Sequence, residues 1–222
     1  MALLLLTMFF GQVPPFSARF EQVTAESSRV DTTRGTIYFA APWRVYYEVD
    51  YPLKQLVSAV MGELTICYPD ESLAYVIKAP SQLESPMSQQ SMGMGDPARA
   101  ISEIGLKPGK RRMAGDTVYA VWNPRDRRAP LGRVTFGRVG RATVFVEVTR
   151  RDGRPMVRSR MSAHIQVDTF ELPTRISTER FGAEGTRTLE TFTYTDLDTS
   201  IDFLKVVGRF SIPPHVKTET YK

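Results

Sequence analysis

Short apolar runs alternate with tight turn signals between residues 35 and 77, and the run from Trp43 to Asp50 is the clearest of them. Side chains alternate between the two faces of a strand. One face of this run is apolar and carries Trp43, Val45, Tyr47 and Val49. The opposite face is more polar and carries Arg44, Tyr46, Glu48 and Asp50. A sheet with one apolar face must cover that face with its own chain, with a partner or with a lipid.

The same alternation, interrupted by glycine, proline and aspartate turn signals, predicts about eleven strands. They are expected at Gly35–Ala40, Trp43–Asp50, Gln55–Val60, Leu64–Tyr68, Leu73–Ile77, Thr117–Trp122, Arg133–Phe136, Thr143–Arg150, Met156–Val167, Arg175–Phe181 and Thr186–Thr195. The Asp-Gly pair in Arg151–Arg154 is typical of a hairpin turn. Because a sheet of this size twists and curls, we expect a mainly β (α+β) fold: a single curved antiparallel sheet that forms an unclosed β-barrel.

Short helices are expected to cap the concave face of this sheet. Apolar residues at helical spacing predict one helix over Pro14–Thr24. Asp96-Pro97 is a good helix start, and the apolar stripe that follows predicts a second helix ending near Gly105. A brief helix or turn is expected between Asp198 and Lys205.

The chain divides into three parts on this pattern. Residues 1–12 are apolar, have the length of a signal-peptide core and are too short to span a bilayer. They are either a leader, which favours export, or a first helix. Residues 13–222 are expected to form one domain, since 222 residues suit one substantial core. Within it, residues 78–115 are rich in proline, glycine and methionine and predict a helical lid insertion, although loose core filling is an equal alternative.

The composition is that of an ordinary globular protein, 42% hydrophobic and mildly basic, with a net charge of +5. Two stretches, Lys107–Arg112 and Arg125–Arg133, carry much of the positive charge. Basic loops are most often simply solvated; an acidic partner or anionic lipid headgroups come next. Nucleic-acid binding is not expected, because no aromatic residues are interleaved with the cations and no recognition helix or zinc pattern accompanies them. No later segment is apolar enough to span a membrane, so a soluble exported protein is expected.

Catalytic and metal-binding chemistry find little support in the residues. The single cysteine, Cys67, excludes an intramolecular disulfide and is expected to be a buried strand thiol. His164 and His215 stand in no metal-ligand spacing and are expected to be structural or surface residues. Glu48 and Asp50 share a strand face, as paired catalytic carboxylates do. Such a pair is more often two ordinary charged residues on a solvated surface. We expect no enzyme activity, no cofactor and no metal.

Motifs at both ends of the domain resemble the outer-membrane lipoprotein carrier (LolA) family. Phe16-Ser17-Ala18-Arg19-Phe20-Glu21-Gln22 is similar to the opening Phe-x-Ala-x-Phe-x-Gln of that family, and the run Gly35–Phe39 is similar to its Gly-x-apolar strand. The strand opened by Pro42 and the hairpin Gly62–Tyr68 follow in the family order. Phe210–Val216 resembles the Phe-x-apolar-x-Pro-Pro-x-x-Val ending, with one residue fewer before the prolines.

The resemblance implies an open antiparallel barrel that carries acylated lipoproteins through the periplasm as a monomer. It implies delivery from an inner-membrane lipoprotein-releasing ABC transporter to an outer-membrane receptor. Ile101 and Ile104 would belong to the lid. The residues that would line the acyl cavity are Phe20, Ile37, Phe39, Trp43, Val45, Tyr47, Val49, Ile66, Tyr68 and Trp122.

One departure from the family pattern affects the lid. The family has an arginine before the proline that opens the strand Trp43–Asp50, where it helps to hold the lid shut, whereas this chain has Ala41. The nearby Arg44 falls on the opposite strand face. The same fold also serves lipid sensors and envelope-stress regulators that bind a membrane partner. A sensor or scaffold of that kind, docking through Arg125–Arg133, is therefore the alternative to a carrier.

Overall fold

The computed structural model describes residues 14–41, 44–60, 63–78, 106–126, 131–168, 170–182 and 185–221. Most of them lie in the strands of one sheet, together with a single turn of 3-10 helix, η1 (Pro69–Glu71), and the helix α3 (Phe203–Arg209). The strands are β1 (Phe16–Glu26), β2 (Arg29–Ala41), β3 (Arg44–Tyr51), β4 (Gln55–Val60), β5 (Glu63–Tyr68), β6 (Leu73–Lys78), β7 (Leu106–Ala114), β8 (Thr117–Pro124), β9 (Leu131–Val139), β10 (Ala142–Arg150), β11 (Pro155–Val167), β12 (Phe170–Phe181), β13 (Arg187–Asp198) and β14 (Lys217–Tyr221).

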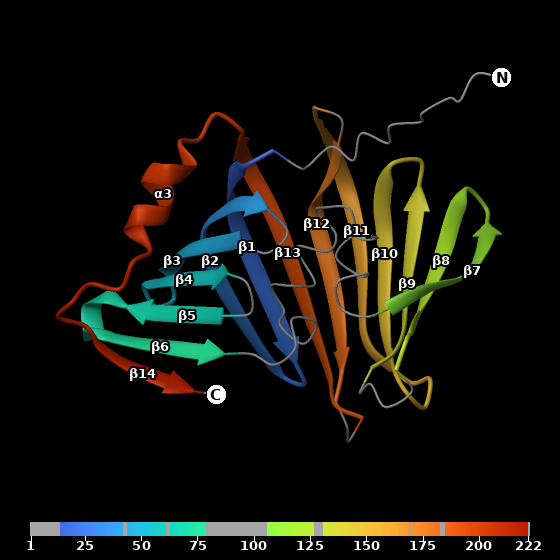
Figure 1. Cartoon of the computed structure of the whole chain (residues 1–222), viewed down its shortest axis with the longest axis horizontal. Coiled ribbons are helices and arrows are strands. Elements are labelled where there is room, and N and C mark those ends of the chain that lie inside the picture. Colours follow the sequence, from blue (N-terminus) through green and yellow to red (C-terminus); the bar gives the residue numbers. More distant parts are fainter. Residues whose placement is uncertain are drawn as a thin grey trace.

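The described strands form one curved, unclosed sheet in the order β14-β6-β5-β4-β3-β2-β1-β13-β12-β11-β10-β9-β8-β7. Neighbours pair antiparallel, except that β14 lies parallel to β6. Strand β1 joins the two halves, because it pairs with both β2 and β13. Figure 1 shows β14 and α3 at one end of the molecule and the free edge strand β7 at the other. The predicted curved, open antiparallel sheet is confirmed.

All eleven predicted strands are present, and three described strands were not predicted: β1, β7 and β14. The predicted helix at Pro14–Thr24 is wrong, since this segment belongs to β1. Phe16 and Phe20 are four residues apart, a spacing that fits a helix and a strand equally well. The deciding residue is Ala18, which is buried between them with period two. Backbone pairing on both sides of β1 then fixes the strand.

The structure describes only part of the predicted lid. Residues 79–105, including Ile101, Ile104 and the helix expected after Asp96, lie outside the described residues, as do residues 1–12. Residues 106–114 form strand β7 in place of lid helix. The sequence does not predict this strand, because its cations and Pro108 give no alternation of apolar and polar residues. An edge strand that is exposed on both sides needs no such alternation.

Alternation gives the sheet two distinct faces. Ile37, Phe39 and Tyr47 belong to the largest buried cluster, on what we call the inner face. Tyr38 and Tyr46 point to the outer face, where they pack with Val206 and Phe210 of the α3 region. The described helix therefore covers the outer face, whereas the sequence led us to expect capping helices on the concave one. Helix α3 overlaps the brief helix predicted near Lys205 and begins with Asp202, whose side chain accepts from the Lys205 backbone N–H.

The turn predicted at Arg151–Arg154 fits its sequence signal. The hairpin after β10 closes with the Arg150 N–H donating to the Arg154 carbonyl over 2.8 Å. Gly153 takes a φ of +86° there, a value that favours glycine.

Within the described residues, no helix is long and apolar enough to cross a membrane.

Candidate ligand-binding face

The candidate site is the inner face of the sheet, a continuous apolar surface that crosses both halves of the molecule. Its cluster comprises Phe16, Ala18, Phe20, Ile37, Phe39, Val45, Tyr47, Val49, Val57, Leu106, Val134, Phe136, Val146, Val148, Val157, Met161, Val167, Leu172, Ile176, Phe192 and Tyr194. Each is at most 8% exposed. Period-two patterning on successive strands produces this surface, since every second residue of each strand faces the same way.

Aromatic rings line the centre of the inner face, around β1. Phe20 meets Tyr47 edge to face at a centroid distance of 5.5 Å and lies 6.3 Å from Phe192. Phe16 stacks on Phe39 at 5.2 Å. These contacts join β13, β1, β2 and β3, four consecutive strands near the middle of the sheet order. Such rings offer large, rigid apolar surface to a bound chain.

The structure brings together most of the predicted cavity residues. Six lie in the inner-face cluster: Phe20, Ile37, Phe39, Val45, Tyr47 and Val49. Ile66 and Trp122 are partly buried against it, one from each half of the sheet. Tyr68 is not part of the cluster; its ring contacts Tyr75 at 6.0 Å. Trp43 lies outside the described residues.

Sequence reasoning missed the C-terminal half of this face. Phe136, Val146, Ile176, Phe192 and Tyr194 contribute as much of it as the predicted residues do. The signal was present, because Phe192 and Tyr194 alternate within a predicted strand. What the sequence lacks is the pairing of β1 with β13, which places them beside Phe20.

Two tyrosine hydroxyls are buried within this apolar surface. Burial raises the pKa of Tyr47 and of Tyr194, because the ionised phenolate loses its hydration. The Tyr47 phenolate would further raise the pKa of Tyr194, so the two groups influence each other. Both side chains stay neutral at physiological pH and contribute dipoles to an otherwise apolar site.

A buried polar group borders the apolar surface at one end of β11, β12 and β13. The Ser159 and Thr178 hydroxyls lie 2.9 Å apart and are both buried. Beside them, Arg180 Nε donates to Glu190 Oε1 over 2.9 Å, and its Nη2 lies 3.4 Å from Oε2. The inner face is therefore apolar at its centre and polar at this end.

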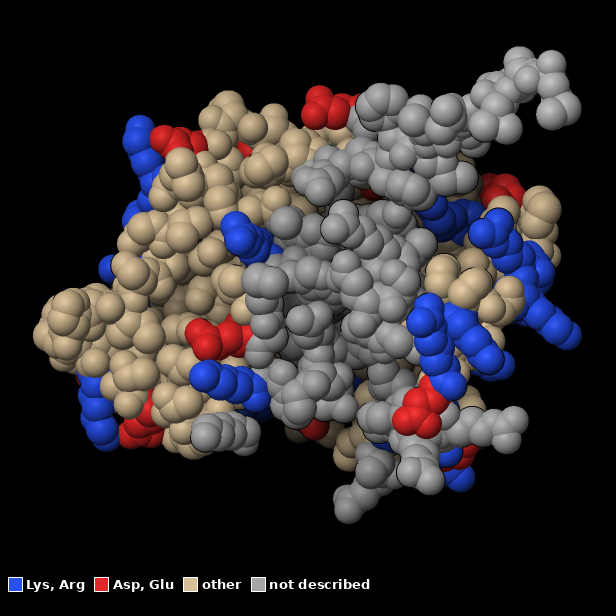
Figure 2. Space-filling view, viewed as in Figure 1, with Lys and Arg blue, Asp and Glu red and all other residues tan. Residues whose placement is uncertain are grey.

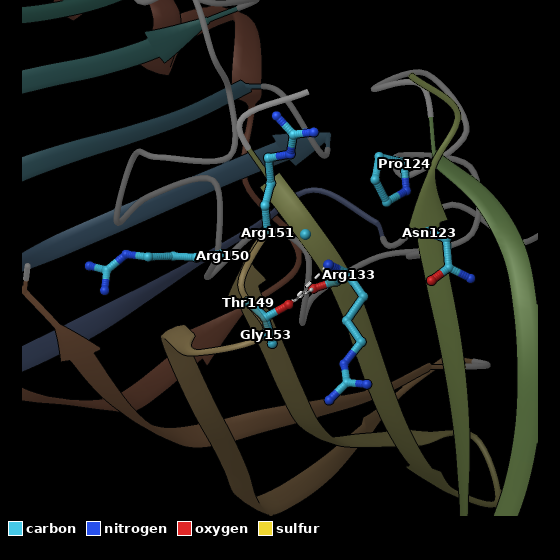
Figure 3. Close-up of a pocket in the computed structure, with 8 residues that line it drawn as sticks. Asn123, Pro124, Arg133, Thr149, Arg150, Arg151 and Gly153 are labelled. Carbon is cyan, nitrogen blue, oxygen red and sulfur yellow. Dashed lines mark hydrogen bonds between the residues drawn. The ribbon is translucent and has the colours of Figure 1, made fainter. Parts of the chain in front are cut away.

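A separate open pocket of about 310 Å³ lies between β8, β9 and the β10–β11 turn (Figure 3). The residues that line it are Asn123, Pro124, Gly132, Arg133, Thr149, Arg150, Arg151 and Gly153. Figure 3 shows the three arginine side chains pointing in different directions. The Arg150 guanidinium donates to the Phe181 carbonyl over 2.7 Å, away from the pocket centre. Three cations that diverge do not make an anion site, so this pocket is not the candidate site.

The groups considered for catalysis have structural partners. Glu48 accepts from the Tyr38 hydroxyl over 3.2 Å, and Asp50 pairs with Arg19 at 3.0 Å. His164 Nε2 lies 3.0 Å from the Thr143 carbonyl oxygen. Cys67 is a buried free thiol, as predicted, and burial raises its pKa. No group of three or more His, Cys, Asp or Glu side chains in the described part of the chain could hold a metal ion.

No family model and no curated protein matches the sequence. Solved structures do match it. A LolA superfamily protein from Nitrosomonas europaea superposes with a TM-score of 0.59 at 17% identity, covering 84% of this chain and 86% of its own. A domain named as an outer-membrane lipoprotein-sorting protein, from Vibrio parahaemolyticus, gives 0.59 at 12% identity over 87% and 91% of the two chains.

The chain has a LolA-like fold. A DUF1329 family protein from Desulfovibrio piger shares the architecture, with a TM-score of 0.61 at 14% identity over 86% and 87% of the chains. Identities this low establish the fold alone. What a LolA-like sheet does in this chain has to be argued from its inner face.

Proposed function

We propose that this chain is a non-catalytic periplasmic carrier that binds the acyl chains of lipoproteins on its inner face and moves them from the inner to the outer membrane. The observation that carries the proposal is the continuous apolar inner face, centred on the aromatic rings of Phe20, Tyr47 and Phe192, on a sheet that does not close. The named neighbours include a lipoprotein-sorting domain with the same architecture, which supports the choice of cargo.

The physical task of such a carrier is reversible shielding. Each buried methylene contributes about 0.8 kcal/mol, so a lipoprotein with several acyl chains would aggregate or bind any nearby membrane. An inner face made of valine, isoleucine and phenylalanine side chains offers comparable apolar area in water. Tyr47 and Tyr194 add polar hydroxyls without adding charge, because burial favours their neutral forms.

Access to the inner face requires movement. Its side chains are buried, so an acyl chain reaches them only when part of the protein gives way. A cover that returns after release would keep the empty carrier from exposing an apolar patch. The lid predicted over residues 78–115 is the proposed moving part, and its segment with Ile101 and Ile104 lies outside the described residues, whereas residues 106–114 belong to β7. With Ala41 at the position of the family arginine, closure has to depend on other contacts.

The proposed partners follow from this role. An inner-membrane lipoprotein-releasing ABC transporter would load the carrier, and an outer-membrane receptor would unload it. The carrier would act as a monomer, since one chain supplies the whole inner face.

Titration of the purified full chain with a fluorescent fatty acid and a fluorescent triacylated lipopeptide tests the proposal. Tyr47 is too deeply buried to substitute with a charged residue, so the test variant is Ile66→Gln, at the partly buried border of the inner-face cluster. The matched control is Leu56→Gln, an equally partly buried aliphatic on the outer face of the adjoining strand. We expect Ile66→Gln to weaken binding about fivefold, as the loss of part of one buried aliphatic contact predicts, and Leu56→Gln to leave it unchanged.

Equal affinities in the two variants would contradict the assignment of the inner face. Absence of binding in the wild-type chain would contradict the function itself. A transfer assay separates a carrier from the sensing alternative. A carrier passes the loaded lipopeptide to acceptor vesicles that hold the receptor, whereas a sensor binds the lipopeptide and retains it.

A further inference from the structure

Strand β7 is the free edge of the sheet and the most basic element in the described chain. Every residue from Lys107 to Ala114 is exposed, and four of them are cations: Lys107, Lys110, Arg111 and Arg112. Asp116, in the turn that follows, is the one carboxylate between residues 106 and 124. Lys and Arg side chains gather over the β7–β9 end of the molecule in Figure 2.

Several strand cations elsewhere are paired with carboxylates on other strands of the sheet. Arg19 pairs with Asp50, Arg34 with Glu21, Arg158 with Glu147 and Arg187 with Glu179. The four cations of β7 have no carboxylate within ion-pair distance among the described residues. Arg112 instead lies over the Tyr119 ring at 5.1 Å, and Tyr119 is braced by Phe145. The strand therefore presents uncompensated positive charge on a fixed support.

The charge lies on both sides of the edge and next to exposed apolar side chains. Arg111 pairs with Ala120, which lies on the inner-face side, whereas Arg112 pairs with Tyr119 on the outer side. At the tip of the β7–β8 hairpin, Met113 is 73% exposed and sits opposite Val118, which is 39% exposed. Cations flanking a small apolar tip are the combination that favours an anionic lipid surface.

Addition of a partner strand to this edge is disfavoured by the same segment. Pro108 has no N–H to donate, and the register shifts between Pro108 and Arg111. Proline, bulges and cations are the features that keep sheet edges from pairing. The cations also lie on both sides of the edge, so they do not form one row in register with a partner strand. A plane of lipid phosphates needs no such register.

We propose that the β7 edge docks this protein on anionic phospholipid bilayers, with Lys107, Lys110, Arg111 and Arg112 at the headgroup phosphates and Met113 and Val118 at the interface. The inference rests on the proposed carrier function, because docking here brings the β7 end of the inner face to the membrane that gives up or receives the acylated cargo. Helix α3 and β14 then point away from the membrane (Figure 1).

Vesicle co-sedimentation of the full chain tests the proposal. The vesicles contain phosphatidylcholine alone or phosphatidylcholine with 30% phosphatidylglycerol, at low and at physiological salt. The β7 variant carries Lys107→Gln, Lys110→Gln, Arg111→Gln and Arg112→Gln. The control variant removes the same charge from exposed positions elsewhere and carries Arg44→Gln, Lys54→Gln, Arg160→Gln and Arg175→Gln. Circular dichroism verifies the fold of both.

We expect the wild type and the control to bind the anionic vesicles, weakly at physiological salt and more tightly at low salt. The β7 variant should lose about two to three orders of magnitude in partition coefficient, and none of the proteins should bind pure phosphatidylcholine. Equal losses in both variants, or no binding by the wild type, would overturn the proposal. So would a wild type that ignores vesicles but binds an acidic polypeptide in a β7-dependent way. Fatty-acid titration separates the two proposals. A wild type that binds fatty acid but not anionic vesicles would overturn the docking inference and leave the carrier function, whereas the β7 variant should bind fatty acid as the wild type does.

Discussion

Arg209 in helix α3 reaches Glu48 in strand β3, with Nη1 3.6 Å from Oε2. Its guanidinium also lies over the Tyr38 ring at 5.1 Å, and the Tyr38 hydroxyl donates to the same Glu48 oxygen. Glu48 is thus the point where the helix is tied electrostatically to the outer face. A carboxylate that shares a strand face with Asp50 has a structural role in this fold.

The aromatic contacts beneath α3 should hold the helix more strongly than this ion pair. Phe210 is nearly buried and contacts Tyr46 at a centroid distance of 5.0 Å and Tyr38 at 6.0 Å. We expect Phe210→Ala to lower the free energy of unfolding by about 3 kcal/mol. Glu48→Gln should cost about 0.5 kcal/mol, because the Arg209 side chain is 53% exposed and solvent screens the pair. Urea denaturation of both variants measures the two values, and a larger loss for Glu48→Gln would reverse this ranking.

The buried tyrosines should make the protein lose stability in alkali. Burial raises the pKa of Tyr47 and Tyr194 above the ordinary value near 10, so both stay protonated in the folded state while they ionise in the unfolded chain. The unfolded state then binds fewer protons, and stability falls as the pH rises above about 10. At pH 11, one such tyrosine should account for a loss of about 1.4 kcal/mol.

Tyr47→Phe provides the measurement for this prediction, since it keeps the ring and removes the titrating hydroxyl. The drop in unfolding free energy between pH 8 and pH 11 should be smaller in the variant than in the wild type by about that amount. Identical drops in the two proteins would show that the Tyr47 hydroxyl ionises in the folded state as readily as in the unfolded one.

The sequence predicts the sheet well where one strand face is apolar and the other polar. Residues 44–50 of the predicted run lie in β3, and Val45, Tyr47 and Val49 belong to the inner-face cluster, as their alternation with polar residues predicts. Prediction from alternation fails where neither face of a strand is buried, or where both faces are. Strand β7 is exposed on both sides and reads as a basic loop, whereas the start of β1 contains Phe16 and Phe20 at a spacing shared by helix and strand. In both segments the strand conformation is fixed by pairing with other strands. Local sequence patterns do not reveal that pairing.

The candidate site is predicted in part for the same reason. The residues chosen from the N-terminal strands do meet on one face, as alternation requires. Phe192 and Tyr194, on the strand paired with β1, are 172 and 174 positions from Phe20 in the sequence, so no local pattern connects them. The sequence also does not predict the polar end of the inner face. Arg180 and Glu190 become partners only because β12 pairs with β13.

The Arg180–Glu190 pair offers a test of how much the polar end of the inner face contributes to stability. Glu190 is buried, and the pair is joined by two N–O contacts, so removing either partner leaves a poorly hydrated charge. We expect Glu190→Leu and Arg180→Met each to cost about 2 kcal/mol. The double variant should cost clearly less than their sum, because no unpaired charge remains. Additive losses in a double-mutant cycle would show that the two side chains act independently.

Two glycine-to-alanine substitutions should have opposite signs. A Cβ at Gly35 would lie 2.0 Å from the Glu48 backbone oxygen, where β2 and β3 shift register, so Gly35→Ala requires the two strands to move. It should lower the free energy of unfolding by about 2 kcal/mol or more. Gly208 lies within α3 and a Cβ there meets nothing within 4 Å. Gly208→Ala should therefore raise stability by about 0.5 to 1 kcal/mol, since alanine loses less backbone entropy in a helix. Thermal and urea denaturation read out both changes. A neutral Gly35→Ala would mean that the close approach of β2 to the Glu48 carbonyl relaxes at little cost, so glycine would not be required at that position.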